Sequence, residues 1–406
     1  MNKTAPWPGL ARALVLLAAV AAVWSVAFAQ SSNAPQEILE GVTLSSPGPF
    51  YDPPSGKLLR VEKLTGVTLP QGVQGWRILY TTTVNDNTPA TAVAVVFAST
   101  NLPPGPRPVI DWVHGTTGLL QRCMPSLVSV PHTGIPAFVE AISAGWVVVA
   151  TDYSFAEKGG PHPYIIGSGE ARAGLDAVRA AHEISGLTLD TKTVVWGHSQ
   201  GGHSALWTGI VGPQYAPDLK LVGVAAIAPA ADMGRILREN QSVNARLGPY
   251  VAAAYSRFYP DIKFDEAIRP EALAGSSEIV GFCGFIPAEK ARIAEIMAAT
   301  RGPFLALDTD HALVARLAEN KADKMIAAPV FVAQGMTDAV VLPAFTDGYV
   351  AERCAVGQPI TYLRISGRDH AGIVKPDSPL TQPLIAWTSD RFAGKAAPKG
   401  CSTTEL

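Results

Sequence analysis

Ser199 has the surroundings of a serine nucleophile. It lies in the pattern Gly-His-Ser-Gln-Gly, after an apolar segment and before a segment of helical composition. A Gly-x-Ser-x-Gly turn holds its serine on a sharp strand-to-helix bend, and its glycines allow neighbouring backbone to pass closely. The helix-initial N–H of Gln200 would be free to hydrogen-bond a developing oxyanion. These features predict a nucleophile at Ser199 rather than an ordinary turn residue.

A serine nucleophile needs a general base, and the base needs an orienting carboxylate. Asp338 follows the apolar segment 329–335, and His370 follows the next apolar segment, 360–366. Both residues then lie beyond the carboxyl ends of parallel strands, at the edge of the sheet where Ser199 is expected. The sequence therefore predicts Asp338 as the acid and His370 as the base. The alternatives are a solvated helix cap for the former and a surface loop for the latter.

The acid and the second oxyanion donor each have an alternative assignment. Asp369 is the rival acid, but its adjacency to His370 in the chain makes it a poor orienter of that ring. The second oxyanion donor is expected in the glycine-containing loop after segment 108–115. There the N–H of Thr116 or Thr117 would supply it, and a plain turn is the alternative.

The histidines and cysteines do not form a metal-binding pattern, and we expect no metal site. His198 and His203 are five residues apart, a spacing that would splay them on a helix, so structural roles are expected. The cysteines form no Cys-x-x-Cys motif, and two disulfides are the default in an exported chain. The four are Cys123, Cys283, Cys354 and Cys401.

Apolar segments alternate with helical patterns, which predicts an α/β fold with a mostly parallel, doubly wound sheet. In segment 169–185, for example, apolar residues return at helical spacing. The expected strands are 76–84, 91–100, 108–115, 146–153, 193–199, 221–230, 329–335 and 360–366. Their nearly uninterrupted apolar character suits strands that are covered on both faces.

The alternation stops between about Gly234 and Ile326. This stretch is rich in Ala, Glu and Arg and has helical patterns without a clear strand. We expect a helical cap inserted over the catalytic edge, whose apolar residues would line an acyl pocket. They include Ile293, Ile296 and Met297. A packed structural subdomain is the alternative.

The N-terminal residues have the zones of a secretory signal peptide over residues 1–29. Lys3 and Arg12 precede an apolar stretch that ends in Ala-Phe-Ala at Ala29. A retained membrane anchor is the alternative. We therefore expect a hydrolase domain over 30–406 in a secreted or periplasmic protein, without a stable membrane span after processing.

The composition excludes several classes of protein. The chain has 406 residues, of which 48% are hydrophobic and 16% charged, so it can bury a large core and is too apolar to be disordered. The formal net charge is −2, and the sequence has no cluster of basic residues that would bind nucleic acid. We therefore do not expect a nucleic acid or another polyanion as a partner.

Several separated blocks resemble the secretory lipases of the fungal lipase-A type and their bacterial relatives. The blocks are DWVHGTTG, RCMPS, TDYSFAEKGGPHPYIIGSGEARAGLDAVRA, WGHSQGGHSALW, GFCGF and FAGKAAPKGC. The resemblance extends from about residue 50 to Cys401. It implies an α/β-hydrolase fold with a helical cap, and ester hydrolysis without metal or cofactor.

The same resemblance carries roles onto individual residues. It implies the nucleophile at Ser199, the acid at Asp338 and the base at His370, in agreement with the assignment from the residues themselves. It also implies two disulfides, which join Cys123 to Cys283 and Cys354 to Cys401.

We predict a secreted serine hydrolase that cleaves carboxylic esters through an acyl-enzyme, either an esterase or a triacylglycerol lipase-like enzyme. Its substrate would be a small-molecule or lipid ester. An acyltransferase or peptidase with the same triad is one alternative, because the pocket selects the leaving group and the acceptor. A catalytically silent binding protein on the hydrolase fold is the other.

Overall fold

The computed structural model describes Met1 and residues 55–85, 88–154 and 162–406. The elements below all belong to the unit Gln36–Leu406. The predicted signal peptide and its anchor alternative fall on residues 1–29, which lie outside the described residues apart from Met1. No helix in the described ranges has both the length and the apolar character that crossing a membrane requires.

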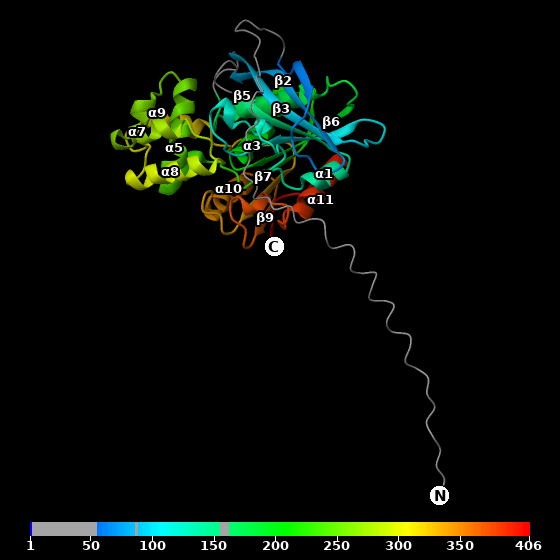
Figure 1. Ribbon diagram of the computed structural model, residues 1–406. Coiled ribbons are helices and arrows are strands. Elements are labelled where there is room, and N and C mark those ends of the chain that lie inside the picture. Colours follow the sequence, from blue (N-terminus) through cyan, green and yellow to red (C-terminus); the bar gives the residue numbers. More distant parts are fainter. Residues whose placement is uncertain (2–54, 86–87, 155–161) are drawn as a thin grey trace. The chain divides into compact units, whose positions relative to one another are not determined.

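A ten-stranded sheet forms the centre of this unit (Figure 1). The strands are, in sheet order, β1 (Leu58–Lys63), β2 (Val73–Asn85), β3 (Thr88–Ser99), β5 (Val147–Ser154), β4 (Arg107–Val113), β6 (Leu189–His198), β7 (Lys220–Ile227), β8 (Val330–Gly335), β9 (Ile360–Ile365) and β10 (Ser402–Glu405). The strands from β5 to β10 pair in parallel, whereas β1, β2, β3 and β5 pair antiparallel. The predicted fold class, a mostly parallel α/β sheet, is confirmed.

Helices cover both faces of the sheet, as the apolar strands require. They are α1 (Phe138–Ser143), α2 (Gly167–Ala181), α3 (Gln200–Tyr215), α10 (Pro343–Ala355) and α11 (Thr381–Phe392). In β6, Val194 and Trp196 pack with residues of α1 and α11, while Val195 packs with residues of α3 and α10. Because successive side chains point to opposite faces of a strand, β6 is buried on both sides and its end is held rigidly.

Strands β1 and β10 are not among those predicted from the sequence. All four residues of β10 are exposed, and Ser-Thr-Thr-Glu has no apolar pattern. The strand forms by main-chain pairing with β9, from Ser402 opposite Thr361 to Glu405 opposite Arg364. Hydrophobic periodicity does not detect an edge strand of this kind.

Between β7 and β8 the chain forms a helical insertion. Its α-helices are α4 (Met233–Glu239), α5 (Gln241–Phe258), α6 (Phe264–Ala267), α7 (Leu273–Ile279), α8 (Pro287–Ala299) and α9 (His311–Glu319). Figure 1 shows α5, α7, α8 and α9 gathered in one lobe. The buried amide of Asn244 cross-links it, since its Oδ1 accepts from the N–H groups of Phe304 and Leu305 at 2.8 and 3.0 Å.

Candidate active site

Ser199 lies at the turn between β6 and α3 in a strained backbone conformation, with φ 60° and ψ −117°. The flanking glycines are required because the chain passes too close for a side chain. A Cβ atom at Gly197 would lie 1.9 Å from the Gly201 carbonyl oxygen, and one at Gly201 would lie 1.8 Å from the Val113 carbonyl oxygen. The sharp bend therefore raises the serine hydroxyl at the end of the central strands.

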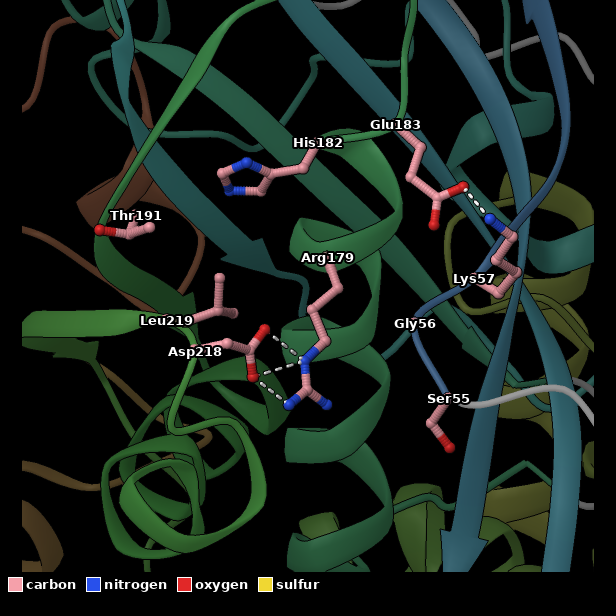
Figure 2. A pocket seen from close by; sticks show the side chains of 9 residues that line it. All are labelled: Ser55, Gly56, Lys57, Arg179, His182, Glu183, Thr191, Asp218 and Leu219. Carbon is pink, nitrogen blue, oxygen red and sulfur yellow. Dashed lines mark hydrogen bonds and ion pairs between the residues drawn. The ribbon is translucent and has the colours of Figure 1, made fainter.

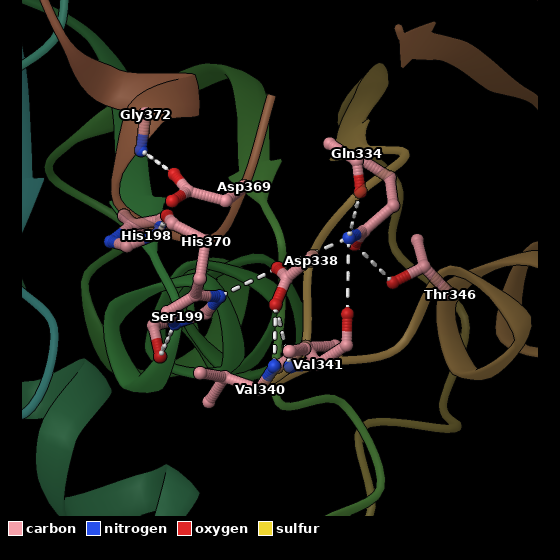
Figure 3. A network of polar contacts seen from close by, with 12 residues as sticks. His198, Ser199, Gln334, Asp338, Val340, Val341, Thr346, Asp369, His370 and Gly372 are labelled. Atoms are coloured by element: carbon pink, nitrogen blue, oxygen red, sulfur yellow. Dashed lines mark hydrogen bonds and ion pairs between the residues drawn. The ribbon is translucent and has the colours of Figure 1, made fainter. Parts of the chain in front are cut away.

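The structure brings together the three residues that the sequence singled out for a triad (Figure 3). His370 Nε2 lies 2.8 Å from Ser199 Oγ, and His370 Nδ1 lies 2.6 Å from Asp338 Oδ2. Ser199 and Asp338 are buried, whereas the His370 side chain is 17% exposed. One continuous hydrogen-bonded chain thus runs from hydroxyl to imidazole to carboxylate.

Backbone amides and a glutamine fix the Asp338 carboxylate. Its Oδ1 accepts from the N–H groups of Val340 and Val341 at 2.8 and 3.0 Å, and its Oδ2 accepts from Gln334 Nε2 at 3.2 Å. Thr346 Oγ1 in turn donates to Gln334 Oε1 at 2.7 Å. These bonds orient the carboxylate toward the imidazole of His370.

Asp369, the rival acid, faces a different partner. It is exposed and accepts a hydrogen bond from the N–H of Gly372 at 2.6 Å. That bond closes a turn at the start of the next short helix, η4 (Gly372–Val374). Figure 3 shows this carboxylate directed toward Gly372 rather than toward the imidazole that Asp338 contacts.

The proposed oxyanion donors lie beside the serine. Gln200 begins α3, so its N–H is one of the first-turn amides without an acceptor inside the helix. The loop after β4 packs against the turn that carries Ser199. A Cβ atom at Gly115 in this loop would lie 3.4 Å from Ser199 Cβ. Thr116 and Thr117 follow in that loop and line the same cavity as Ser199. The geometry is compatible with either threonine as the second donor.

A cavity of about 880 Å³ opens over Ser199 and His370. One wall comes from the sheet and its loops, and the other from the helical insertion. The insertion contributes Arg246, Leu247, Tyr250, Gly284, Phe285, Lys290, Ile293, Ala294 and Met297. Ile296, expected from the sequence to line an acyl pocket, instead packs in the core of the insertion, against the position of Gly275.

A second cavity, of about 660 Å³, lies at the opposite end of the strands (Figure 2). It is bordered by the last turn of α2 and by the residues just before β7. Its charged groups pair with one another, Arg179 with Asp218 and Lys57 with Glu183. It contains none of the residues predicted to be catalytic.

The two histidines near the serine have structural partners. His198 Nε2 donates to the His370 carbonyl oxygen at 2.8 Å, and His203 Nδ1 lies 3.1 Å from Glu170 Oε2. Burial and the neighbouring His370 ring lower the pKa of His198 well below its usual value. Within the described residues, no group of histidine, cysteine and acidic side chains could hold a metal ion.

All four cysteines are paired in disulfides. Cys123 joins Cys283 with a Cα–Cα distance of 5.2 Å, and Cys354 joins Cys401 with 6.1 Å. The first bridge spans 160 residues and ties the loop that follows the threonines to the helical insertion. These are the pairs that the resemblance implied.

Comparison with solved structures identifies this architecture as that of an α/β hydrolase. The crystal structure of lipase A from Candida antarctica matches 87% of this chain and 86% of its own, with a TM-score of 0.68. The sequence identity is 18%, so this likeness concerns the fold.

The chain belongs to the secretory lipase family. The family's sequence model, described as "Secretory lipase", matches residues 132–400. A Mycobacterium tuberculosis protein named a probable inactive lipase is 27% identical over 87% of this chain and 83% of its own. Lipase 6 of Candida albicans is 24% identical over 88% of this chain and 82% of its own. The family and its lipase members support ester hydrolysis as the class of reaction.

Proposed function

We propose that this protein is an exported carboxylic ester hydrolase that acts through Ser199, His370 and Asp338. The observation that carries the proposal is the hydrogen-bonded chain from Ser199 Oγ through both nitrogens of the His370 ring to Asp338 Oδ2. Each residue type matches its task, because a serine hydroxyl is a poor nucleophile until a base removes its proton.

In the first half of the reaction, Ser199 Oγ attacks the ester carbonyl carbon while His370 Nε2 takes the hydroxyl proton. The Asp338 carboxylate stabilises the imidazolium that forms and keeps its proton on Nδ1. The tetrahedral intermediate collapses, the bond to the alcohol oxygen breaks, and His370 returns the proton to the departing alcohol. An acyl-enzyme on Ser199 remains.

In the second half, His370 takes a proton from water as the water oxygen attacks the acyl carbon. The second tetrahedral intermediate releases the carboxylic acid and restores the serine hydroxyl. Both intermediates place negative charge on the former carbonyl oxygen, where the N–H of Gln200 and that of Thr116 or Thr117 would receive it. Donors that bind this charge lower the barrier more than they strengthen substrate binding.

The helical insertion would act as a cap that excludes water and shapes the acyl site. Its support is the cavity wall, in which Leu247, Ile293 and Met297 face the same space as the serine. This apolar wall suits the acyl chain of a lipid or small-molecule ester.

Export is the second part of the proposal. It rests on the signal-peptide pattern over residues 1–29, on two disulfides that suit an oxidising compartment, and on membership in a family of secretory lipases.

The complete set of triad residues favours an active enzyme over a silent binding protein, although one relative bears the name of a probable inactive lipase. The test compares wild-type protein with Ser199→Ala on p-nitrophenyl esters of increasing chain length. We expect turnover by the wild type and loss of at least a hundredfold in the variant. Retention of turnover within tenfold by a folded Ser199→Ala variant would contradict the proposal. Product analysis with an added alcohol or amine separates hydrolysis from acyl transfer.

A further inference from the structure

Glu170, in α2, has a carboxylate that is fully buried beneath the nucleophile turn. Its Oε1 accepts from the side-chain Nε2 of Gln200 at 2.8 Å and from the backbone N–H of Ile165 at 2.9 Å. Its Oε2 lies 3.1 Å from His203 Nδ1. The mechanism above uses none of these atoms. Burying a carboxyl group is costly unless hydrogen bonds compensate it, as they do here.

The first of these bonds leads directly to one oxyanion donor. Gln200 supplies the N–H at the start of α3. The residue is buried, and its side chain is hydrogen-bonded to Glu170. This hydrogen bond restrains Gln200, whose backbone N–H must point at the negative charge that develops on the substrate oxygen.

The second bond leads to the other side of the oxyanion site. Ile165 has φ 55°, a conformation that is strained for a β-branched residue. Two bonds hold it there, the one from its N–H to Glu170 and one from Tyr255 Oη to its carbonyl oxygen at 2.9 Å. The preceding residue, Tyr164, is 1% exposed and its hydroxyl lies 2.9 Å from Thr116 Oγ1.

We propose that Glu170 is a positioning residue whose single oxygen, Oε1, sets both oxyanion donors in place, Gln200 directly and Thr116 through Ile165 and Tyr164. This inference rests on the proposed function, because it assigns the donors of that reaction. His203 completes the support: its Nε2 donates to the Asn320 carbonyl oxygen at 2.8 Å, which links the carboxyl group to the segment after α9.

A positioning role makes a specific kinetic prediction. Oxyanion donors act on the transition state, so misplacing them lowers kcat and leaves KM within about threefold. Removing one donor outright costs about 100- to 1,000-fold in kcat in other hydrolases. Displaced donors should cost less, and we expect a loss of about 10- to 100-fold in Glu170→Ala.

Replacing the reactive carbonyl oxygen of the substrate with sulfur reports on the oxyanion site alone, since sulfur accepts hydrogen bonds weakly. Wild-type protein should cleave an oxygen ester much faster than the matching thionoester. In Glu170→Ala the ratio of these two rates should fall about tenfold, because the donors no longer favour oxygen.

Two variants provide comparison. In Glu170→Gln the amide oxygen can accept from Gln200 and Ile165, and the amide N–H can donate to His203, so we expect kcat within about threefold of the wild type. Asp176→Ala removes another buried carboxylate of α2, which contacts Thr82 and Tyr215. It should lower thermal stability without changing the oxygen-to-sulfur rate ratio.

Tyr164→Phe provides an independent route if Glu170→Ala does not fold. It deletes only the hydroxyl that contacts Thr116, and it should lower kcat and the rate ratio in the same direction. A rate ratio within twofold of wild type in Tyr164→Phe, or in a folded Glu170→Ala variant, overturns the inference. In that case Ser199-dependent turnover by the wild type would still uphold the proposed function. Absence of that turnover would overturn both.

Discussion

The His198 ring supports the main chain of His370. Its Nε2 donates to the His370 carbonyl oxygen at 2.8 Å, and the two ring centroids are 4.6 Å apart. The residue before the serine thus holds the loop that carries the base, although 172 positions separate the two. Because burial and the His370 ring lower the pKa of His198, it stays neutral beside the imidazolium that forms during the reaction.

Loss of this contact should loosen the base. We expect His198→Ala to lower kcat about tenfold and the free energy of unfolding by about 1–2 kcal/mol, since a partly buried carbonyl loses its donor. His198→Gln retains an N–H donor and should recover part of both losses. Steady-state kinetics and urea unfolding provide the measurements. Unchanged kcat in His198→Ala would show that the loop carrying His370 does not depend on this hydrogen bond.

The two neighbouring acids should differ sharply in their effect on turnover. Asp338→Asn replaces the acceptor at His370 Nδ1 with an amide that can force the wrong tautomer, and kcat should fall by about 10³- to 10⁴-fold. Asp369→Asn affects an exposed turn and should leave kcat within about threefold. Comparable losses in the two variants would contradict the assignment of Asp338 as the acid.

A substitution in the cavity wall of the insertion should change substrate selectivity, whereas one in its core should change stability. Met297→Ala enlarges the cavity wall and should change the ranking of ester chain lengths, with little effect on a small acetyl ester. Leu313→Ala removes a buried side chain of α9 that does not line the cavity, and it should cost about 2–5 kcal/mol of stability without changing the ranking. If Met297→Ala scales all esters equally, the insertion is a structural subdomain rather than a cap.

A buried acid in β4 should make a contribution to stability that falls as pH rises. Both oxygens of Asp111 are buried without a hydrogen-bond partner, and burial raises its pKa to about 8. Between about pH 4 and pH 8 the folded chain keeps this proton while the unfolded chain has released it, so unfolding is favoured as pH rises. The slope from this one group is at most about 1.4 kcal/mol per pH unit.

Asp111→Asn should make the pH dependence shallower over the same interval and stabilise the protein at pH 8 relative to the wild type. Urea unfolding at pH 5 and pH 8 provides the measurement. Parallel pH dependences in the two proteins would mean that Asp111 does not retain its proton in the folded state.

The sequence was informative wherever a chemical role coincided with a local pattern. Apolar runs followed by Ser199, Asp338 and His370 predicted strands and a common edge, and the structure brings these side chains within hydrogen-bonding distance. Ile296 does not line the cavity that Ile293 and Met297 line, because helical spacing does not say which apolar residues face a cavity and which pack only in the core.

Other features depend on tertiary contacts and have no local signal. Glu170 lies in an ordinary helical pattern, and only the packing of α2 against α3 makes it a buried acceptor. The same holds for β10, whose polar sequence becomes a strand because β9 offers an unpaired edge. The choice between Thr116 and Thr117 depends on where two N–H groups point, which residue types do not specify.

The most direct test of the account is covalent labelling with an organophosphate ester, followed by peptide mass spectrometry. Such reagents react with a serine that has an activating base, and only Ser199 has His370 within hydrogen-bonding distance among the described serines. We predict one adduct per chain, on Ser199, and at least a hundredfold slower labelling in His370→Ala. An adduct on another serine, or labelling of Ser199 at an unchanged rate in His370→Ala, would contradict the proposed catalytic site.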